Sequence, residues 1–373
     1  MNKFAFVGHF ISRGHFNDLV GWPAFVLRRL PQPLLKDLIR IWPPYRCIDI
    51  SPVQSLTHSQ AYGIGISCPL LPEHFVTLNS REVLKKIIDS ARLGERFGAR
   101  IIGLGGFTSA FGNEGEEVAQ RLNVSVTSGN TYTAALTIQG LLKSAELMEL
   151  NVSESRVAVI GATGDIGSIC AKVFSKKCAE LILAARKEKR LIEFASEIEC
   201  DASARIRIAK HTTDAIKDAD LILTATSAIT TLIEPADLKV GAIVCDVAYP
   251  ANISRDIWQR RDDVFVFEGG LATWPFYNQL KDLRKLQQFS PPGTVHGCLA
   301  ETMLLALEEK FVNFSLGRGY ITEARIDEIV GIAQKHGFTL APFRCGDISY
   351  SHNDIDRIRK AAKAKRQSQV LVV

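Results

Sequence analysis

The middle of the chain carries the sequence RVAVIGATGDIG at residues 156–167. The apolar run 157–160 has the length of a buried strand, and glycines follow it at positions 161, 164 and 167. In a strand-turn-helix unit the first glycine permits the tight turn, the second lets the backbone approach a pyrophosphate, and the third allows close helix–strand packing. The phosphates would lie on free N–H groups at the start of the helix. The pattern predicts a dinucleotide site with contacts from Gly161, Thr163, Gly164, Asp165, Ile166 and Gly167.

The next apolar strand ends beside basic residues. Arg186 follows that strand, about 20 residues beyond the glycines, where such folds place the side chain that reads the ribose. An acidic residue there would accept a hydrogen bond from the 2′-OH of NAD, whereas an arginine would hold a 2′-phosphate. We therefore predict NADP(H) as the cofactor. The alternative is a basic helix start that contacts only solvent.

Strand and helix patterns alternate over residues 156–270, which predicts a Rossmann-like, doubly wound parallel sheet in an α/β protein. Strands are expected at 156–160, 181–185, 221–226, 242–247 and 264–267. Ligands of such sheets lie at the carboxyl ends of the strands. Those ends add four residues to the predicted cofactor site: Thr226, Ser227, Tyr249 and Gly270.

We expect three consecutive segments along the chain. Residues 1–128 form an N-terminal α/β region for substrate, residues 129–290 form the NADP-binding domain with a lead-in helix at 129–150, and residues 291–373 form a helical C-terminal segment. Further helices are expected at 81–97, 296–311 and 322–336.

The composition is that of a globular protein, with 373 residues, of which 46% are hydrophobic and 23% charged. No apolar stretch reaches the roughly 20 residues that span a bilayer, and the N-terminus lacks the features of a signal peptide. The eight cysteines contain no Cys-x-x-Cys pair, which argues against a zinc site and a disulfide framework. We expect a protein of the reducing cytoplasm with no metal and no nucleic-acid partner.

The net charge is +5, and the sharpest local excess of basic residues lies near the C-terminus. Six basic residues fall there without an acidic one among them: Arg357, Arg359, Lys360, Lys363, Lys365 and Arg366. The segment is either a solvated helix or a surface for an acidic partner.

One cysteine stands apart because of its place in the pattern. Cys298 falls in the first turn of the helix that follows the Pro291-Pro292-Gly293 break, where free N–H groups and the helix dipole would stabilise a thiolate. A thiolate near NADPH would suit thioester chemistry, although a packed small hydrophobe is the commoner role of a cysteine. Glu301 lies one turn further on the same face and could orient the site or exchange protons. His296 could act as a base only if it precedes the helix.

Several further segments occur in order across nearly the whole chain. They are FVGH at 6–9, SCPLLP at 67–72, LGGFTS at 104–109, GNT at 129–131, VAVIGATGDIGS at 157–168, C-x-AE-x-MLL at 298–305, NFS-x-GR at 313–318 and HGF at 336–338. Together they resemble the long-chain acyl–acyl carrier protein reductases best known from cyanobacteria. Tyr132 and the pair 247–248 depart from that pattern.

The resemblance implies that NADPH reduces a fatty acyl thioester, carried by acyl carrier protein or coenzyme A, to a fatty aldehyde. It implies that Cys298 carries the acyl group, that the acidic carrier protein is a partner, and that another enzyme could consume the aldehyde. Two alternatives stay open. Asp246-x-x-Tyr249-Pro250 resembles the shikimate dehydrogenase group, which would predict oxidation of a small hydroxy acid. A non-catalytic NADP-sensing protein would bind the cofactor without consuming it.

Overall fold

A computed structural model describes residues 2–12, 14, 29–248, 250–254 and 257–370. The chain forms two compact units, each of which contains two separate stretches of sequence. The first unit comprises residues 1–133 and 272–339, and the second comprises residues 134–271 and 340–373. None of the described helices is long and apolar enough to cross a membrane.

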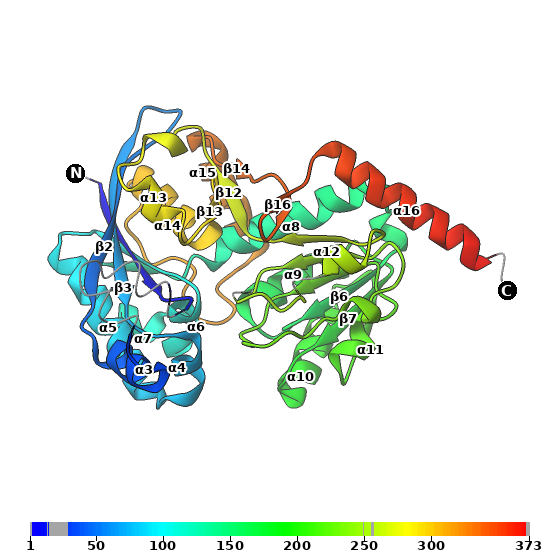
Figure 1. The fold of residues 1–373 in the computed structure, drawn as a ribbon, viewed down its shortest axis with the longest axis horizontal. Coiled ribbons are helices and arrows are strands. Elements are labelled where there is room, and N and C mark those ends of the chain that lie inside the picture. Colours follow the sequence, from blue (N-terminus) through cyan, green and yellow to red (C-terminus); the bar gives the residue numbers. More distant parts are fainter. Residues whose placement is uncertain (1, 13, 15–28, 249, 255–256, 371–373) are drawn as a thin grey trace. The chain divides into compact units, whose positions relative to one another are not determined.

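The second unit is built on a parallel sheet. Its strands are β6 (Arg156–Ile160), β7 (Glu180–Ala184), β8 (Arg205–Ile208), β9 (Leu221–Thr224), β10 (Ile243–Asp246) and β11 (Phe265–Glu268). They lie in the order β11-β10-β9-β6-β7-β8, and every neighbouring pair is parallel. Since the order reverses at β6, the carboxyl ends of β6 and β9 form the topological switch point at which such sheets bind ligands. This arrangement confirms the predicted Rossmann-like fold (Figure 1).

The helices of this unit lie before, between and after the strands of its sheet. They are α8 (Asn130–Leu147), α9 (Asp165–Ser175), α10 (Glu188–Glu199), α11 (Thr212–Ile216), α12 (Ile257–Arg260) and the C-terminal α16 (His352–Val370). Residues Val157 to Ile160 are buried, and so are the apolar residues of β7, β9 and β10. Continuous apolar runs of this kind are expected in parallel strands, because both faces of the sheet are covered.

The first unit has its own five-stranded sheet. Its strands are β1 (Lys3–His9), β2 (Tyr45–Gln54), β3 (Gln60–Cys68), β4 (Ile101–Leu104) and β5 (Ser125–Thr127), in the order β2-β3-β1-β4-β5. Only the hairpin pair β2–β3 is antiparallel. The helices are α3 (Gln32–Ile41), α4 (Pro72–Thr77), α5 (Ser80–Arg96), α6 (Phe107–Glu114), α7 (Glu116–Ala119), α13 (Leu283–Leu286), α14 (Gly297–Leu307) and α15 (Glu323–His336). The short strands β12 (Leu271–Thr273), β13 (Val295–His296), β14 (Thr339–Leu340), β15 (Arg344–Cys345) and β16 (Ile348–Ser349) complete the chain.

The C-terminal residues do not form the separate segment that we expected for 291–373. Helix α14 and helix α15 belong to the first unit, whereas α16 belongs to the second. The reason is the character of each helix. Every residue of α14 except Cys298 is buried, so this helix needs apolar neighbours on all sides and lies within the core of the first unit. Helix α16 is largely polar, buries a small apolar face with Ile355, Ile358 and Ala362, and forms ion pairs through its basic side chains.

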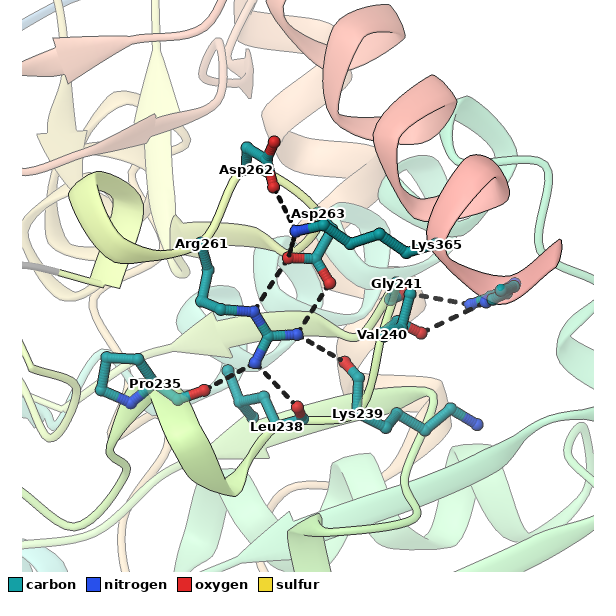
Figure 2. A network of polar contacts seen from close by, with 10 residues as sticks. Pro235, Leu238, Lys239, Val240, Gly241, Arg261, Asp262, Asp263 and Lys365 are labelled. Carbon is teal, nitrogen blue, oxygen red and sulfur yellow. Dashed lines mark hydrogen bonds and ion pairs between the residues drawn. The ribbon is translucent and has the colours of Figure 1, made fainter. Parts of the chain in front are cut away.

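The basic residues of α16 are largely paired with carboxylates of the second unit. Arg359 and Lys363 form ion pairs with Glu149, and Lys365 bonds to Asp262 and Asp263. Figure 2 shows that Asp263 lies between Lys365 and Arg261. Arg261 donates two hydrogen bonds of 2.8 Å to this carboxylate. The tail is therefore a docked helix whose charges are mostly neutralised.

Asp263 is a buried anion that depends on this network. Its side chain is 1% exposed. Burial by itself would raise its pKa, but the hydrogen bonds from Arg261 and Lys365 outweigh burial and lower the pKa to about 2. A carboxyl group with a lowered pKa stabilises the fold above its unfolded-state pKa, and this contribution is lost as the pH falls from about 4 to 2.

We predict that Asp263→Ala lowers the free energy of unfolding by about 3 kcal/mol, because the partly buried Arg261 loses its buried counterion. Lys365→Ala should cost less than about 1 kcal/mol, since Lys365 is half-exposed and solvent screens its charge. Urea unfolding followed by circular dichroism measures both, with Lys85→Ala, from the exposed pair Lys85–Asp89, as the control. Equal small losses in all three variants would contradict this account.

Candidate active site

The glycine turn after β6 has the close backbone contacts that its sequence predicts. Gly161 has φ +89°, and a Cβ added to it would lie 2.3 Å from the carbonyl oxygen of Ala225. A Cβ added to Gly167 would lie 2.2 Å from the carbonyl oxygen of Gly161. Side chains are therefore excluded at both positions by backbone atoms. The sheet and the first helix could not approach so closely with other residues.

Gly164 differs from its two neighbours because the space around it is open. A Cβ there would meet its nearest atom, the carbonyl oxygen of Gly161, at 3.4 Å. Gly164 is the N-cap of α9, and Asp165 is the first helical residue. The first N–H groups of a helix have no acceptor within the helix, so this end of α9 suits an anion. Thr163, Asp165 and Ile166 are partly exposed around it.

Arg186 follows β7, and Ser227 lies beyond β9, on the two sides of β6. An Nη2–H of Arg186 donates a hydrogen bond of 3.0 Å to the hydroxyl of Ser227. Both side chains are exposed, so the guanidinium retains donors for a ligand. The structure thus brings Arg186 and Ser227 to the switch point of the sheet. The Gly161 turn lies there too, since it packs against the backbone of Ala225 just after β9.

The remaining predicted cofactor residues are less closely grouped. Thr226 donates a hydrogen bond of 2.7 Å to the side-chain oxygen of Asn252. Gly270 is buried with φ +70° just after β11, which β10 separates from β9. Tyr249 lies outside the described residues.

Asp246, which the sequence offered only as part of the motif Asp246-x-x-Tyr249-Pro250, organises the loop after β10. Asp246 is buried and accepts hydrogen bonds from the backbone N–H groups of Ala248 at 3.0 Å and Asn252 at 2.7 Å. Burial raises the pKa of this carboxyl to about 6. Because Asn252 in turn bonds to Thr226, Asp246 fixes the loop beside the cofactor turn. Asp246 is the last residue of β10, at the carboxyl edge of the sheet where ligands of such sheets bind, and that position was its signal in the sequence.

Cys298 is the second residue of α14 and is the least buried residue of that helix. The backbone N–H groups of Leu299 and Gly106 face its sulfur. Burial nevertheless raises the pKa of the Cys298 thiol to about 11, against the lowering effect of these two groups, and the charge of Glu301 raises it further. The helix start therefore does not hold the thiolate that we expected, because desolvation outweighs the backbone donors.

Glu301 is directed toward the start of α8. It is fully buried, and its carboxylate accepts hydrogen bonds of 2.7 Å from the backbone N–H of Tyr132 and from the hydroxyl of Ser315. The Thr127 hydroxyl and the Gly129 N–H also donate to it. Burial raises the pKa of this carboxyl against these hydrogen bonds. The carboxylate thus fixes the Gly129 turn.

That turn lies directly against Cys298. Gly129 has φ +74°, and an added Cβ would lie 2.2 Å from the Cα of Cys298. His296 precedes α14, as a role as base would require, and its Nε2 lies 2.9 Å from the carbonyl oxygen of Phe289. Among the described residues, no group of three or more His, Cys, Asp or Glu side chains could hold a metal ion.

Comparison with known proteins agrees with this geometry. A family model described as shikimate/quinate 5-dehydrogenase matches residues 143–268. The nucleotide-binding domain of glutamyl-tRNA reductase from Thermoplasma volcanium aligns with 36% of this chain and 84% of its own, at 22% identity and a TM-score of 0.27, which is too remote to bear on function.

Two curated proteins match nearly the whole chain. Aminotransferase PigE of Serratia sp. is 30% identical over 347 residues, which are 91% of this chain but only 40% of PigE. The long-chain acyl-[acyl-carrier-protein] reductase of Synechococcus elongatus is 28% identical over 349 residues, which are 90% of this chain and 98% of the reductase. The chain is thus similar, along nearly its whole length, to this cyanobacterial long-chain acyl-[acyl-carrier-protein] reductase.

Proposed function

We propose that the chain is an NADPH-dependent reductase that converts a long-chain fatty acyl thioester into a fatty aldehyde through an acyl group on Cys298. The proposal rests on the surroundings of the Cys298 thiol. It is partly exposed at the start of an otherwise buried helix, with the Gly106 and Leu299 N–H groups directed at its sulfur. The acyl donor is acyl carrier protein, the carrier in the name of the Synechococcus relative, with acyl-coenzyme A as the second donor.

In the acyl-transfer step the Cys298 sulfur attacks the carbonyl carbon of the donor thioester. A new thioester forms on Cys298, the bond to the donor sulfur breaks, and the proton of the Cys298 thiol ends on the released donor thiol. The N–H groups of Gly106 and Leu299 stabilise the sulfur as it loses its proton. When bound, NADPH supplies the hydride that, with one proton, converts this thioester into an aldehyde and frees the thiol.

Glu301 serves as a positioning residue in this proposal. Each of its carboxylate oxygens accepts hydrogen bonds from groups around the Gly129 turn, so the carboxylate holds the turn against Cys298. A carboxylate this close to the sulfur opposes ionisation of the thiol. Its value to the reaction is therefore geometric, and the general acid that protonates the product is a different group.

The residues of the second unit fit the proposed cofactor. The open approach to Gly164 and the start of α9 suit the pyrophosphate, and Arg186 suits the 2′-phosphate. We infer contacts from Thr163, Asp165 and Ile166 in the turn and from Thr226, Ser227, Tyr249 and Gly270 at the strand ends. The shikimate dehydrogenase model matches only residues 143–268, which contain the nucleotide turn and none of the surroundings of Cys298.

The proposed setting is a reducing cytoplasm, since all eight cysteines are free thiols. A fatty aldehyde is a reactive product, so we infer that an aldehyde-consuming enzyme acts next. The paired charges of α16 argue against that helix as the main contact for an acidic carrier.

We predict one acyl adduct on Cys298 when the protein is incubated with acyl-[acyl carrier protein] and no NADPH. Intact-mass spectrometry and peptide mapping measure the adduct. Cys298→Ala should form no adduct and no aldehyde but should still bind NADPH, whereas Cys200→Ala, at an exposed cysteine, should behave as the wild type. Aldehyde formation by Cys298→Ala at the wild-type rate would refute the covalent step.

The raised pKa of Cys298 makes its reactivity dependent on pH. Because only the thiolate reacts and the pKa is about 11, alkylation by iodoacetamide should rise about tenfold per pH unit from 7 to 10. A cysteine peptide, with an ordinary pKa of about 8.5, should level off earlier. Peptide mass spectrometry follows the Cys298 peptide, and a rate that is constant above pH 8 would contradict the burial argument.

The preference for NADPH should depend on Arg186. Arg186→Asp should weaken NADPH binding by about 1–3 kcal/mol and leave NADH binding nearly unchanged, because only the 2′-phosphate contact is lost. Arg205→Asp, at an exposed arginine of the same unit, is the control. Titration of each variant with NADPH and with NADH measures the two affinities. Equal losses of affinity for the two cofactors would contradict a contact between Arg186 and the 2′-phosphate.

A further inference from the structure

His9, the last residue of β1, is buried with a defined tautomer. Its Nδ1 lies 2.9 Å from the carbonyl oxygen of Phe10, and only a protonated Nδ1 makes that contact favourable. The other nitrogen, Nε2, is then the acceptor for the backbone N–H of Phe107, at 3.2 Å. Burial lowers the pKa of His9 to about 4, so the ring is neutral at physiological pH and keeps this pattern.

Gly106 precedes Phe107 in the chain, and its N–H faces the Cys298 sulfur. Gly106 has φ +57° and ψ −133°, a conformation that residues with a side chain rarely adopt. A Cβ added to Gly106 would lie 2.7 Å from Nε2 of His9. The imidazole therefore lies directly against the Gly106 turn.

A backbone hydrogen bond also joins the turn 105–107 to β1. The Gly105 N–H donates to the carbonyl oxygen of Val7 at 2.9 Å, and the Thr108 hydroxyl accepts from the Gly105 N–H at 3.0 Å. The rings of Phe75 and Phe107 lie 5.0 and 5.4 Å from the His9 ring, so its surroundings are apolar. His9 is the side chain that holds the turn on the Gly106 side.

We propose that His9 is a positioning residue for Cys298, whose Nε2 holds the turn 105–107 so that the Gly106 N–H faces the sulfur. This inference rests on the proposed function, because the contact between the Gly106 N–H and the Cys298 sulfur matters for catalysis only if Cys298 is the nucleophile. Other titratable groups bear on this thiol differently. Glu301 opposes ionisation from the same helix, and His296 precedes the helix with its Nε2 toward Phe289.

The test compares two replacements of His9. His9→Gln places an amide oxygen where it accepts the Phe107 N–H, whereas His9→Leu fills the site without an acceptor. If the turn relaxes, the sulfur loses the Gly106 donor and its pKa rises. Alkylation of Cys298 by iodoacetamide at pH 8.5 should then fall about three- to tenfold in His9→Leu, equivalent to a pKa rise of about 0.5 to 1. His9→Gln should stay within about twofold of the wild type.

His74→Leu is the matched control. His74 is also buried in the first unit, and its Nδ1 accepts the Leu71 N–H at 3.1 Å, but it does not contact the turn. Its removal should leave the alkylation profile unchanged. A folded His9→Leu protein with the wild-type profile would overturn the proposal. Should His9→Leu fail to fold, Gly106→Ala moves the same turn, and an unchanged profile in that variant would overturn it equally.

Iodoacetamide needs neither an acyl donor nor NADPH, so this result is separate from the test of function. A wild-type protein that forms no acyl adduct contradicts the proposed reaction. The alkylation profiles of the His9 variants decide the positioning role alone.

Discussion

Close contact between the backbone of Cys298 and Gly129 determines where the Cys298 sulfur lies. There is no room for a side chain at Gly129, since its Cβ would lie 2.2 Å from the Cα of Cys298. The contact is stable only if something holds the Gly129 turn in place, and the buried carboxylate of Glu301 does so through hydrogen bonds to Gly129 and Tyr132. A carboxyl group is thereby kept within the core near the proposed nucleophile. Glu301 therefore fixes the Gly129 turn through hydrogen bonds, while its charge raises the pKa of the Cys298 thiol.

Backbone donors oppose this effect of Glu301 on the thiol. The Gly106 and Leu299 N–H groups lower the pKa of Cys298 against the effects of burial and Glu301. One donor belongs to the helix of the cysteine itself, while the other depends on a turn that is distant in sequence and borders His9. Burial and Glu301 favour the protonated thiol, so in the proposed reaction the proton moves together with the acyl transfer.

Much of the fold could be predicted because its signals are local. The run 156–160 became β6 with the same limits, and the helices expected at 81–97 and 322–336 correspond to α5 and α15 within one residue at each end. The strand β8 was missed because its residues are only partly buried and alternate with arginines. The grouping of segments could not be read from the sequence. Helix α14 belongs with residues 1–133 because it is buried on all sides. Helix α16 belongs to the second unit, where it forms ion pairs with Glu149.

The candidate residues could be proposed from the sequence, but the energetics of the site could not. Cys298 and Glu301 stand out in the sequence, whereas the raised thiol pKa depends on burial, which only tertiary structure reveals. A single-turnover experiment tests the central claim most directly. Protein acylated on Cys298 is freed of donor, mixed with NADPH, and analysed for aldehyde and for the Cys298 peptide. The account predicts one aldehyde per acylated Cys298 and recovery of the free thiol. An acyl group that stays on Cys298, or that is found on another residue, would contradict it.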